Sequence, residues 1–459
     1  MNLKNRNKLL IVALGCVALI CNPMSAMAQD SPSNTASSNL RVSLEEAKQY
    51  AISHNHTMQN ATYAEKKAEA QKWQVISTML PQVKLAYDYT NFCGHEMDFS
   101  AMGIGKIKDP STGTFSVTAS ITLSGAQIAG AHVTKLASEL SKINTEKNNQ
   151  DISSDVIQTY MSILMLEKTN GLLKENLENI KTLQTATDEA VRVGVSEETD
   201  ADQLKVQVAS MKNTINQTER SIETLYNTLK TLLGASFDTK IVLTDSIGNL
   251  LNAEKALNLL SQNINLNNNN NYRILKANTE IAKGQVTQAW WNYGPQVTAF
   301  YQYSNKQYFA DDVNPFSKMS DIPHIVGISA SWTPFTSGGN YAKVKAAKMD
   351  LATAQSTLEL TADQLKIQDA QARFNLNSTY ENYKTQEENL EVTAKVLAST
   401  TNKFRYGTAS SLDVTNASTN LIIAQNNYVS AMSDLINAQI TLEKLLNTPN
   451  SSTQTTANK

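Results

Sequence analysis

The sequence predicts an α+β fold made of two tandem copies of one unit, in which a β-hairpin leads into very long helices. Three observations predict it: the positions of the prolines, a repeat with a nearly constant offset, and a change in the spacing of apolar residues inside each copy. The chain has 459 residues, of which 18% are charged and 41% apolar, so it is not disordered overall. A formal net charge of −2 gives no support to nucleic-acid binding, which requires a basic surface.

A secretory signal peptide is predicted over residues 1–28. A basic stretch is followed by an apolar run over 9–20 and by the cleavage motif Ala26-Met27-Ala28. The run is too short to span a bilayer, so a retained membrane anchor is the weaker interpretation, and two cysteines in the segment leave lipidation open. Cleavage leaves Cys93 as the only cysteine, so the exported chain cannot form an internal disulfide and must be stabilised by packing.

The distribution of proline and an internal repeat define the organisation of the mature chain. Proline is absent from 111–294 and from 335–448, and because a proline inside a helix costs about 3 kcal/mol, both stretches can be helical throughout. Four landmarks recur in the same order at an offset of 213 or 214 residues: Pro81 and Pro295, Gly125 and Gly338, Gly194 and Gly407, Leu232 and Leu445. The sequence therefore predicts a first repeat over 29–262, a second over 263–448 and a flexible tail over 449–459.

Each copy begins with two segments in which apolar and polar residues alternate, which is the pattern of a half-buried strand. The predicted strands are 82–90 and 114–124 in the first copy, and 296–304 and 324–334 in the second. Polar loops over about 91–113 and about 305–323 join each pair of strands. The alternation gives every strand one apolar, aromatic-containing face and one face of Ser, Thr, Gln, Lys and Asp.

After each hairpin the apolar residues recur seven apart, as Leu351, Leu358 and Leu365 do, which predicts coiled-coil helices. The predicted long helices are 125–193 and 338–406, the return helices are 196–234 and 409–447, and an equatorial segment covers 235–262. At 1.5 Å per residue each long helix would be roughly 100 Å long, so it must project from any ordinary globular domain.

The strands decide between two environments. A sheet usually buries its apolar face on a soluble core, but here no segment is left to cover that face. In lipid, every strand edge must be paired, because an unpaired backbone group costs several kcal/mol. A membrane barrel needs at least about 8 strands, so three chains pooling their strands into a barrel of about 12 would satisfy this requirement.

The chain resembles the TolC-like outer-membrane efflux proteins. The resemblance rests on the helix start Ser43-Leu44-Glu45-Glu46-Ala47, on the segment 332–339, and on the two turns at 192–196 and 405–414. It implies a homotrimer with a 12-stranded outer-membrane β-barrel, in contact with outer-membrane lipid, that continues into a long periplasmic α-barrel. It also implies two protein partners, a periplasmic adaptor protein and an inner-membrane pump.

The function implied by this resemblance is an exit duct in a tripartite efflux or type I secretion system. Such a duct conducts substrates passively from the adaptor and pump to the exterior. The alternative is an exported trimeric coiled-coil stalk or adhesin without a through-channel. The sequence does not identify the transported substrate, and no catalytic constellation or cofactor motif occurs in it, so neither an enzyme nor a cofactor is predicted.

The resemblance assigns the two turns to contact with the adaptor. The residues so assigned are Arg192, Gly194, Val195, Arg405, Gly407 and Thr408. The alternative is that the glycines only form the turns, where a positive φ suits them.

The resemblance also assigns Asp200 and Asp413 to an acidic constriction at the tip. In a three-fold assembly each aspartate becomes a ring of three, which attracts cations. The alternative is a favourable interaction with the helix dipole, because both lie in the first turn of a helix. The sequence departs from the family pattern at Ala409 and Asn416, which stand in place of a basic and an acidic residue, so it does not identify a closed-state latch.

The remaining motifs have structural interpretations. Ser43 and Glu46 predict a capping box, and the asparagine run at 267–271 predicts a polar connector before a helix that begins near Tyr272. His54 and His56 lack partners at zinc-like spacing, so no metal site is predicted, and Cys93 is given no role. Trp290 and Trp291 are interpreted either as membrane-interface anchors or as packing beneath the sheet.

Overall fold

A computed structural model of the chain describes most of the mature sequence. The described residues are 39–103, 105–246, 258–309 and 323–447. The predicted signal peptide and tail lie outside them, as do 247–257 of the equatorial segment and 310–322 of the second loop. The fold described below is that of one compact unit within Leu40–Lys459.

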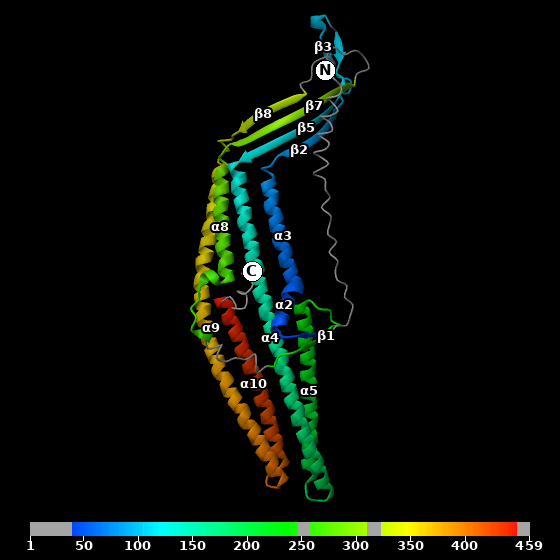
Figure 1. Cartoon of the computed structure of the whole chain (residues 1–459), viewed down its shortest axis with the longest axis vertical. Coiled ribbons are helices and arrows are strands. Elements are labelled where there is room, and N and C mark those ends of the chain that lie inside the picture. Colours follow the sequence, from blue (N-terminus) through cyan, green and yellow to red (C-terminus); the bar gives the residue numbers. More distant parts are fainter. Residues whose placement is uncertain (1–38, 104, 247–257, 310–322, 448–459) are drawn as a thin grey trace, which may run out of the picture. The chain divides into compact units, whose positions relative to one another are not determined.

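The fold is α+β, with one antiparallel sheet of four strands in the order β2–β5–β7–β8 (Figure 1). The strands are β2 (Gln82–Thr90), β5 (Ser111–Ser124), β7 (Gln296–Phe309) and β8 (His324–Ser331). One row of the register places Val83, Ala119, Tyr301 and Val326 on one face. That face is open to the surroundings in the single chain, since Val326 and Ile328 are each 79% exposed.

The first inter-strand loop contains structure that the alternation pattern did not predict. β3 (Glu96–Asp98) pairs with β4 (Lys106–Lys108) as a separate two-stranded sheet. Its register sets Glu96 opposite Lys108 and Asp98 opposite Lys106, and such pairs of opposite charge stabilise strand pairing. Each strand has only three residues, too few for its alternation to be recognised. The sequence predicted a polar loop over about 91–113 and did not predict this hairpin within it.

Three strand ends also differ from the prediction, the first being that of β5, which begins at Ser111 and not at 114. β7 continues to Phe309 because β5 begins at Ser111 and supplies hydrogen-bonding partners for the extra residues. β8 ends at Ser331, three residues before the predicted end at 334. The sheet is thus longer on the β5–β7 pair than on its two edges.

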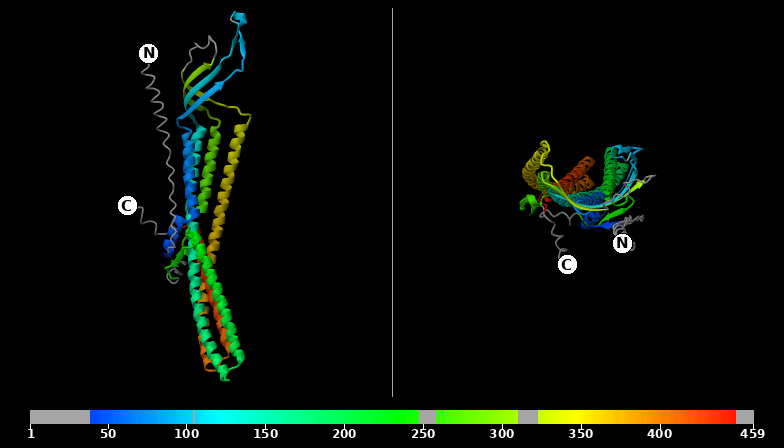
Figure 2. Two further views of the ribbon diagram at one scale, coloured as in Figure 1. Left: turned by 90° about the vertical axis from the view of Figure 1, so that its right-hand side faces the viewer. Right: turned by 90° about the horizontal axis from the view of Figure 1, so that it is seen from above.

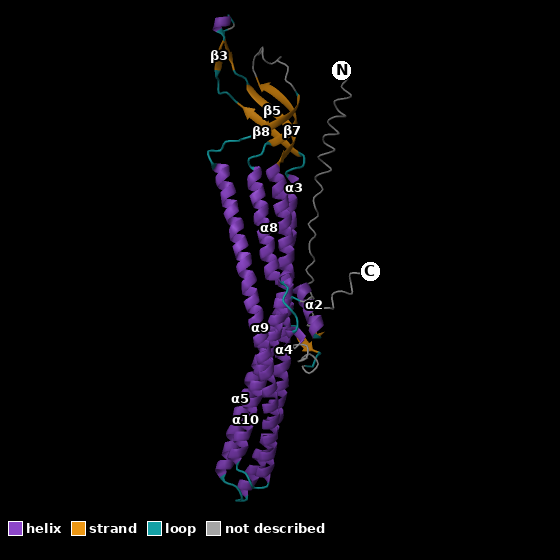
Figure 3. Ribbon diagram, turned by 90° about the vertical axis from the view of Figure 1, so that its left-hand side faces the viewer, coloured by secondary structure: helices purple, strands orange, loops and turns teal. Residues whose placement is uncertain are grey.

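The helices extend away from one end of the sheet (Figure 3). They are α2 (Leu44–His54), α3 (His56–Ser77), α4 (Gly125–Arg192), α5 (Glu198–Leu233), α8 (Asn270–Trp291), α9 (Gly339–Arg405) and α10 (Ser411–Leu446). Near the sheet α4 packs between α3 and α8, and α9 packs on α8; farther away α4 pairs with α5 and α9 with α10. Seen along the helices, strands and sheet-side helices follow one curved arc (Figure 2).

The long helices have 68 residues in α4 and 67 in α9, in agreement with the seven-residue spacing read from the sequence. Each has a length of about 100 Å at 1.5 Å per residue. The capping box of α2 is confirmed, since the Ser43 backbone N–H donates to Glu46 Oε2 at 2.8 Å. None of the helices within the described ranges is long and apolar enough to cross a membrane.

The middle of the unit is fastened by polar contacts. A second small sheet pairs β1 (Asn39–Val42) with β6 (Lys240–Leu243), and it was not predicted. Beside it the Asp245 carboxylate accepts hydrogen bonds from the Leu44 backbone N–H at 2.7 Å and from the buried Tyr160 hydroxyl at 3.0 Å. These bonds join the start of α2 to the middle of α4.

The asparagine run joins three helices at the same level. Asn269 donates to the Leu445 carbonyl at 3.2 Å, and Asn270 donates to Gln150 Oε1 at 2.9 Å. The helix after the run begins at Asn270, two residues before the predicted start. The run is therefore a connector, as predicted, and its hydrogen bonds also link α4, α8 and α10.

Candidate functional site: the two helix–helix turns

Two tight turns lie side by side at the ends of the helices farthest from the sheet (Figure 1). One joins α4 to α5 over 193–197, and the other joins α9 to α10 over 406–410. They contain the residues to which sequence analysis assigned adaptor contact. The first turns of α5 and α10, which follow them, carry the two aspartates.

The first turn is a Schellman motif. Gly194 has a φ of +74°, the left-handed conformation that suits glycine at this position. The Val195 N–H donates to the Ala190 carbonyl at 2.8 Å, and the Gly194 N–H donates to the Val191 carbonyl at 3.0 Å. These two bonds satisfy carbonyls that the end of α4 would otherwise leave unpaired.

The second turn repeats the same geometry. Gly407 has a φ of +72°, and its N–H donates to the Phe404 carbonyl at 2.9 Å. The Thr408 N–H and hydroxyl both donate to the Lys403 carbonyl, at 2.9 and 3.0 Å. Both glycines and Thr408 thus have a role in forming the turns, whatever else contacts them.

Large side chains protrude from both turns. Four of them are more than half exposed: Val193 at 64%, Val195 at 79%, Tyr406 at 85% and Leu412 at 52%. Arg192 pairs with Glu189 at 2.7 Å, whereas exposed Arg405 has no carboxylate within 4 Å among the described residues. Sequence analysis missed Val193 and Tyr406, although a valine and a tyrosine in a short polar turn were a visible signal.

Asp413 is the acidic member of a capping box at the start of α10. Its carboxylate accepts from the Ser410 backbone N–H and from the Ser410 hydroxyl, each at 2.8 Å, and its own N–H donates to Ser410 Oγ at 3.2 Å. These bonds, the backbone one first, stabilise the charged carboxylate and lower the pKa of Asp413 from its ordinary value. Asp413 thus has a structural role at the start of α10, through hydrogen bonds to Ser410 that sequence analysis did not predict.

Asp200 is the repeat counterpart of Asp413 but has a different partner. The residue before α5 is Glu197, which makes no side-chain cap, so the Asp200 carboxylate is not taken up by its own helix start. The Asp200 carboxylate accepts a hydrogen bond from the Ser411 hydroxyl of α10. Gln203 Oε1 lies 3.1 Å from Ser411 Oγ. Ser411 is fully buried. This contact joins the two repeats of the chain at the end farthest from the sheet. Sequence analysis did not identify Ser411 or Gln203.

Above this contact the interface between the repeats includes polar side chains as well as the apolar cluster that joins Val414 of α10 to Leu204 of α5. Ser418 of α10 is fully buried and accepts from Asn176 of α4 at 3.4 Å and from Gln207 of α5 at 3.3 Å. Two neighbouring side-chain oxygens, Asn170 Oδ1 and Gln425 Oε1, are buried without a hydrogen-bond partner within the part of the chain that the structure describes. Unsatisfied groups weaken an interface, so this seam is less tightly held than an apolar one.

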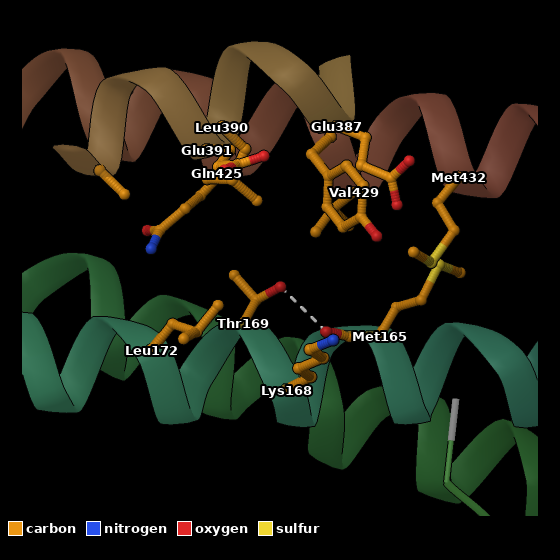
Figure 4. Close-up of a pocket in the computed structure, with 12 residues that line it drawn as sticks. Met165, Lys168, Thr169, Leu172, Glu387, Leu390, Glu391, Gln425, Val429 and Met432 are labelled. Atoms are coloured by element: carbon orange, nitrogen blue, oxygen red, sulfur yellow. Dashed lines mark hydrogen bonds between the residues drawn. The ribbon is translucent and has the colours of Figure 1, made fainter. Parts of the chain in front are cut away.

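A pocket of about 250 Å³ opens beside the seam, between α4, α9 and α10 (Figure 4). Met165 and Met432 lie next to each other at one end of it, and Glu387, Lys168 and Gln425 point into it from different helices. Over 39–103, 105–246, 258–309 and 323–447, no group of three or more His, Cys, Asp and Glu side chains could hold a metal ion.

Comparison with protein-family models identifies one family. A family model described as outer membrane efflux protein matches residues 48–235 and 262–448, which together make up most of the chain. Comparison with curated proteins gives no match.

Solved structures share the fold at low sequence identity. VceC of Vibrio cholerae is 17% identical with a TM-score of 0.69, over 88% of this chain and 96% of that one. The Campylobacter jejuni CmeC outer membrane channel is 16% identical with a TM-score of 0.71, over 88% and 85%. The open state of the Neisseria gonorrhoeae MtrE outer membrane channel is 15% identical with a TM-score of 0.70, over 88% of each chain.

Proposed function

The chain belongs to the outer membrane efflux protein family, and from this premise we propose that it is the exit duct of a tripartite efflux or type I secretion system. The duct is a homotrimer whose sheets form a barrel in the outer membrane and whose helices extend into the periplasm. A periplasmic adaptor and an inner-membrane pump deliver the substrate, and the pump supplies the energy. The segment 1–28 is removed during export.

The open sheet is the observation that carries this proposal. β2 and β8 are its edges, and one face is apolar and exposed while the other has the Ser and Thr side chains of β5. In lipid the edge groups would each cost several kcal/mol unless paired. Pairing β8 of one chain with β2 of the next chain removes every edge, and three chains give a barrel of about 12 strands with a polar lumen.

The tips are the proposed contact surface for the adaptor. Both turns present exposed apolar side chains beside an arginine, a composition that favours protein partners. The contact residues are Arg192, Gly194, Val195, Arg405, Gly407 and Thr408, to which the exposure of Tyr406 adds one more. Asp200 and Asp413 form the proposed acidic constriction just inside the tips.

The alternative of a stalk or adhesin without a channel has weaker support. A stalk would need no four-stranded sheet with an exposed apolar face. The family model matches both repeats of the chain, which also favours a duct.

The test is the single-channel conductance of the detergent-purified mature protein in a planar bilayer, with the mass of the complex measured in parallel. A trimer that gives small, cation-preferring steps is the expected result, because the tip is narrow and acidic. A protein that remains in solution without detergent and gives no conductance would contradict the proposal and favour the stalk.

A further inference from the structure

Aromatic side chains gather where the sheet meets the helices. The chain has four tryptophans, and all of them lie at this level: Trp73 at the end of α3, Trp290 and Trp291 at the end of α8, and Trp332 after β8. Their exposed fractions are 61%, 53%, 50% and 64%. Phe335 and Tyr341, at the start of α9, are 80% and 67% exposed. Trp291 also packs on Gly125, where a Cβ would come within 2.1 Å of the ring.

The helix ends at the same level carry an excess of positive charge. We call the segments 70–77, 125–138, 281–291 and 339–349 the collar. Its lysines are Lys72, Lys135, Lys283, Lys343, Lys345 and Lys348. The nearest acidic residues adjoin its limits on the side away from the sheet: Glu69, Glu139, Glu280 and Asp350. The connections to the strands, 78–81, 292–295 and 332–338, have no charged residue. In a chain of net charge −2, this local excess is a distinct feature.

The collar charge is poorly neutralised within the chain. Lys135 and Lys283 approach carboxylates only at 3.9 and 3.8 Å, and their side chains stay 62% and 68% exposed. The other four lysines have no carboxylate within 4 Å in the described part of the chain. Lys348 Nζ lies 5.5 Å from the centre of the Trp290 ring, so lysine and aromatic side chains occupy one surface.

We propose that the collar binds the headgroups of anionic glycerophospholipids in the membrane leaflet that adjoins the helices. The inference rests on the proposed function, which sets the sheet in a membrane. Tryptophan and tyrosine rings favour the membrane–water interface, and lysine stems extend along apolar surface to bring the ammonium to the headgroups. An anionic leaflet attracts each such lysine, whereas a zwitterionic leaflet does not.

The test uses tryptophan fluorescence, because three of the four tryptophans lie in the collar and Trp332 lies in the connection that leads into it. The full mature protein is reconstituted in phosphatidylcholine vesicles that contain one quarter phosphatidylglycerol. Bromine, which quenches tryptophan on contact, is placed on the acyl chains either of the phosphatidylglycerol or of an equal amount of phosphatidylcholine. We expect brominated phosphatidylglycerol to quench about twofold more, because the collar enriches it locally.

Two triple variants identify the charges responsible. The collar variant changes three unpaired lysines of α9: Lys343→Gln, Lys345→Gln and Lys348→Gln. The matched control makes the same change on α9 far from the sheet: Lys366→Gln, Lys384→Gln and Lys395→Gln. The ratio of quenching by brominated phosphatidylglycerol to quenching by brominated phosphatidylcholine should fall toward one in the collar variant. In the control variant it should stay at about two.

The outcomes separate this proposal from the function it rests on. Equal quenching by the two brominated lipids in the unmodified protein overturns the lipid preference and leaves the duct intact. Excess quenching that persists in the collar variant overturns the assignment to these lysines. Absence of quenching by either lipid means that the junction is not at a membrane interface, and both proposals then fail.

Discussion

Gly194 and Gly407 hold the left-handed conformation that ends each long helix, and a Cβ at either position would meet no atom within 4 Å. A substitution there therefore affects only the backbone energy. Gly171 also has open space for a Cβ, but it lies inside α4. We expect Gly407→Ala to lower the free energy of unfolding by about 1 kcal/mol and Gly171→Ala to raise it by about 0.5–1 kcal/mol. Denaturant unfolding followed by circular dichroism measures both, and changes of the same sign would contradict this account.

Asp413 should make the tip sensitive to acid. Its pKa is lowered in the folded chain, so its stabilising effect is complete above the unfolded value of about 3.9 and is lost as the pH falls through the lower folded value. Asp413→Asn keeps an acceptor but has no charge to lose. We expect the melting temperature of the unmodified protein to exceed that of the variant above about pH 5, with the difference shrinking below about pH 4. A difference independent of pH would show that the charge of the cap is unimportant.

At the scale of the element, the contact between α5 and α10 should hold the proposed duct closed. A hydrogen bond to a charged group contributes about 1.5–3 kcal/mol, so Ser411→Ala should shift the population toward open channels by about tenfold or more. Asp200→Asn keeps the acceptor and removes the charge, so it should weaken block by multivalent cations and shift the open population less than Ser411→Ala does. Asp413→Asn should weaken the block in the same way. Single-channel recording gives both the open population and the block by multivalent cations. Unchanged block in the Asp200→Asn, Asp413→Asn double variant would contradict the proposed acidic constriction.

How far elements can be predicted depends on where their information lies. α4 and α9 could be predicted because a long run without proline and a seven-residue apolar spacing are local properties of the sequence. The Gly194 and Gly407 turns could be predicted for the same reason. Ser411 could not, because its role depends on Asp200, which lies 211 residues earlier and approaches only when the two copies pack. β1 and β6 are four residues each, too short for a recognisable pattern.

At the scale of the whole chain, sequence analysis predicted two hairpins but not how they join. The structure pairs β5 with β7 along 14 residues, so the copies share one sheet whose edges are β2 and β8. No residue pattern within either copy encodes that pairing, because both hairpins alternate in the same way. The open edges are what make association of several chains a physical requirement of the proposed membrane location.

α9 carries the surface on which a second copy of the chain is expected to pack. Leu365 and Ala372 are buried against the chain's own core, whereas Ile367 and Phe374, about 200° farther round the helix, are 59% and 77% exposed. Burying such a side chain contributes about 1.5–3 kcal/mol, so Ile367→Glu with Phe374→Glu should shift the detergent-solubilised protein from trimer to monomer. Gln368→Glu, an exposed neighbour on another face, is the matched control and should stay trimeric. Light scattering gives the masses. A double variant that remains a trimer would mean that this stripe does not form the contact between copies, and the closed barrel would then need another interface.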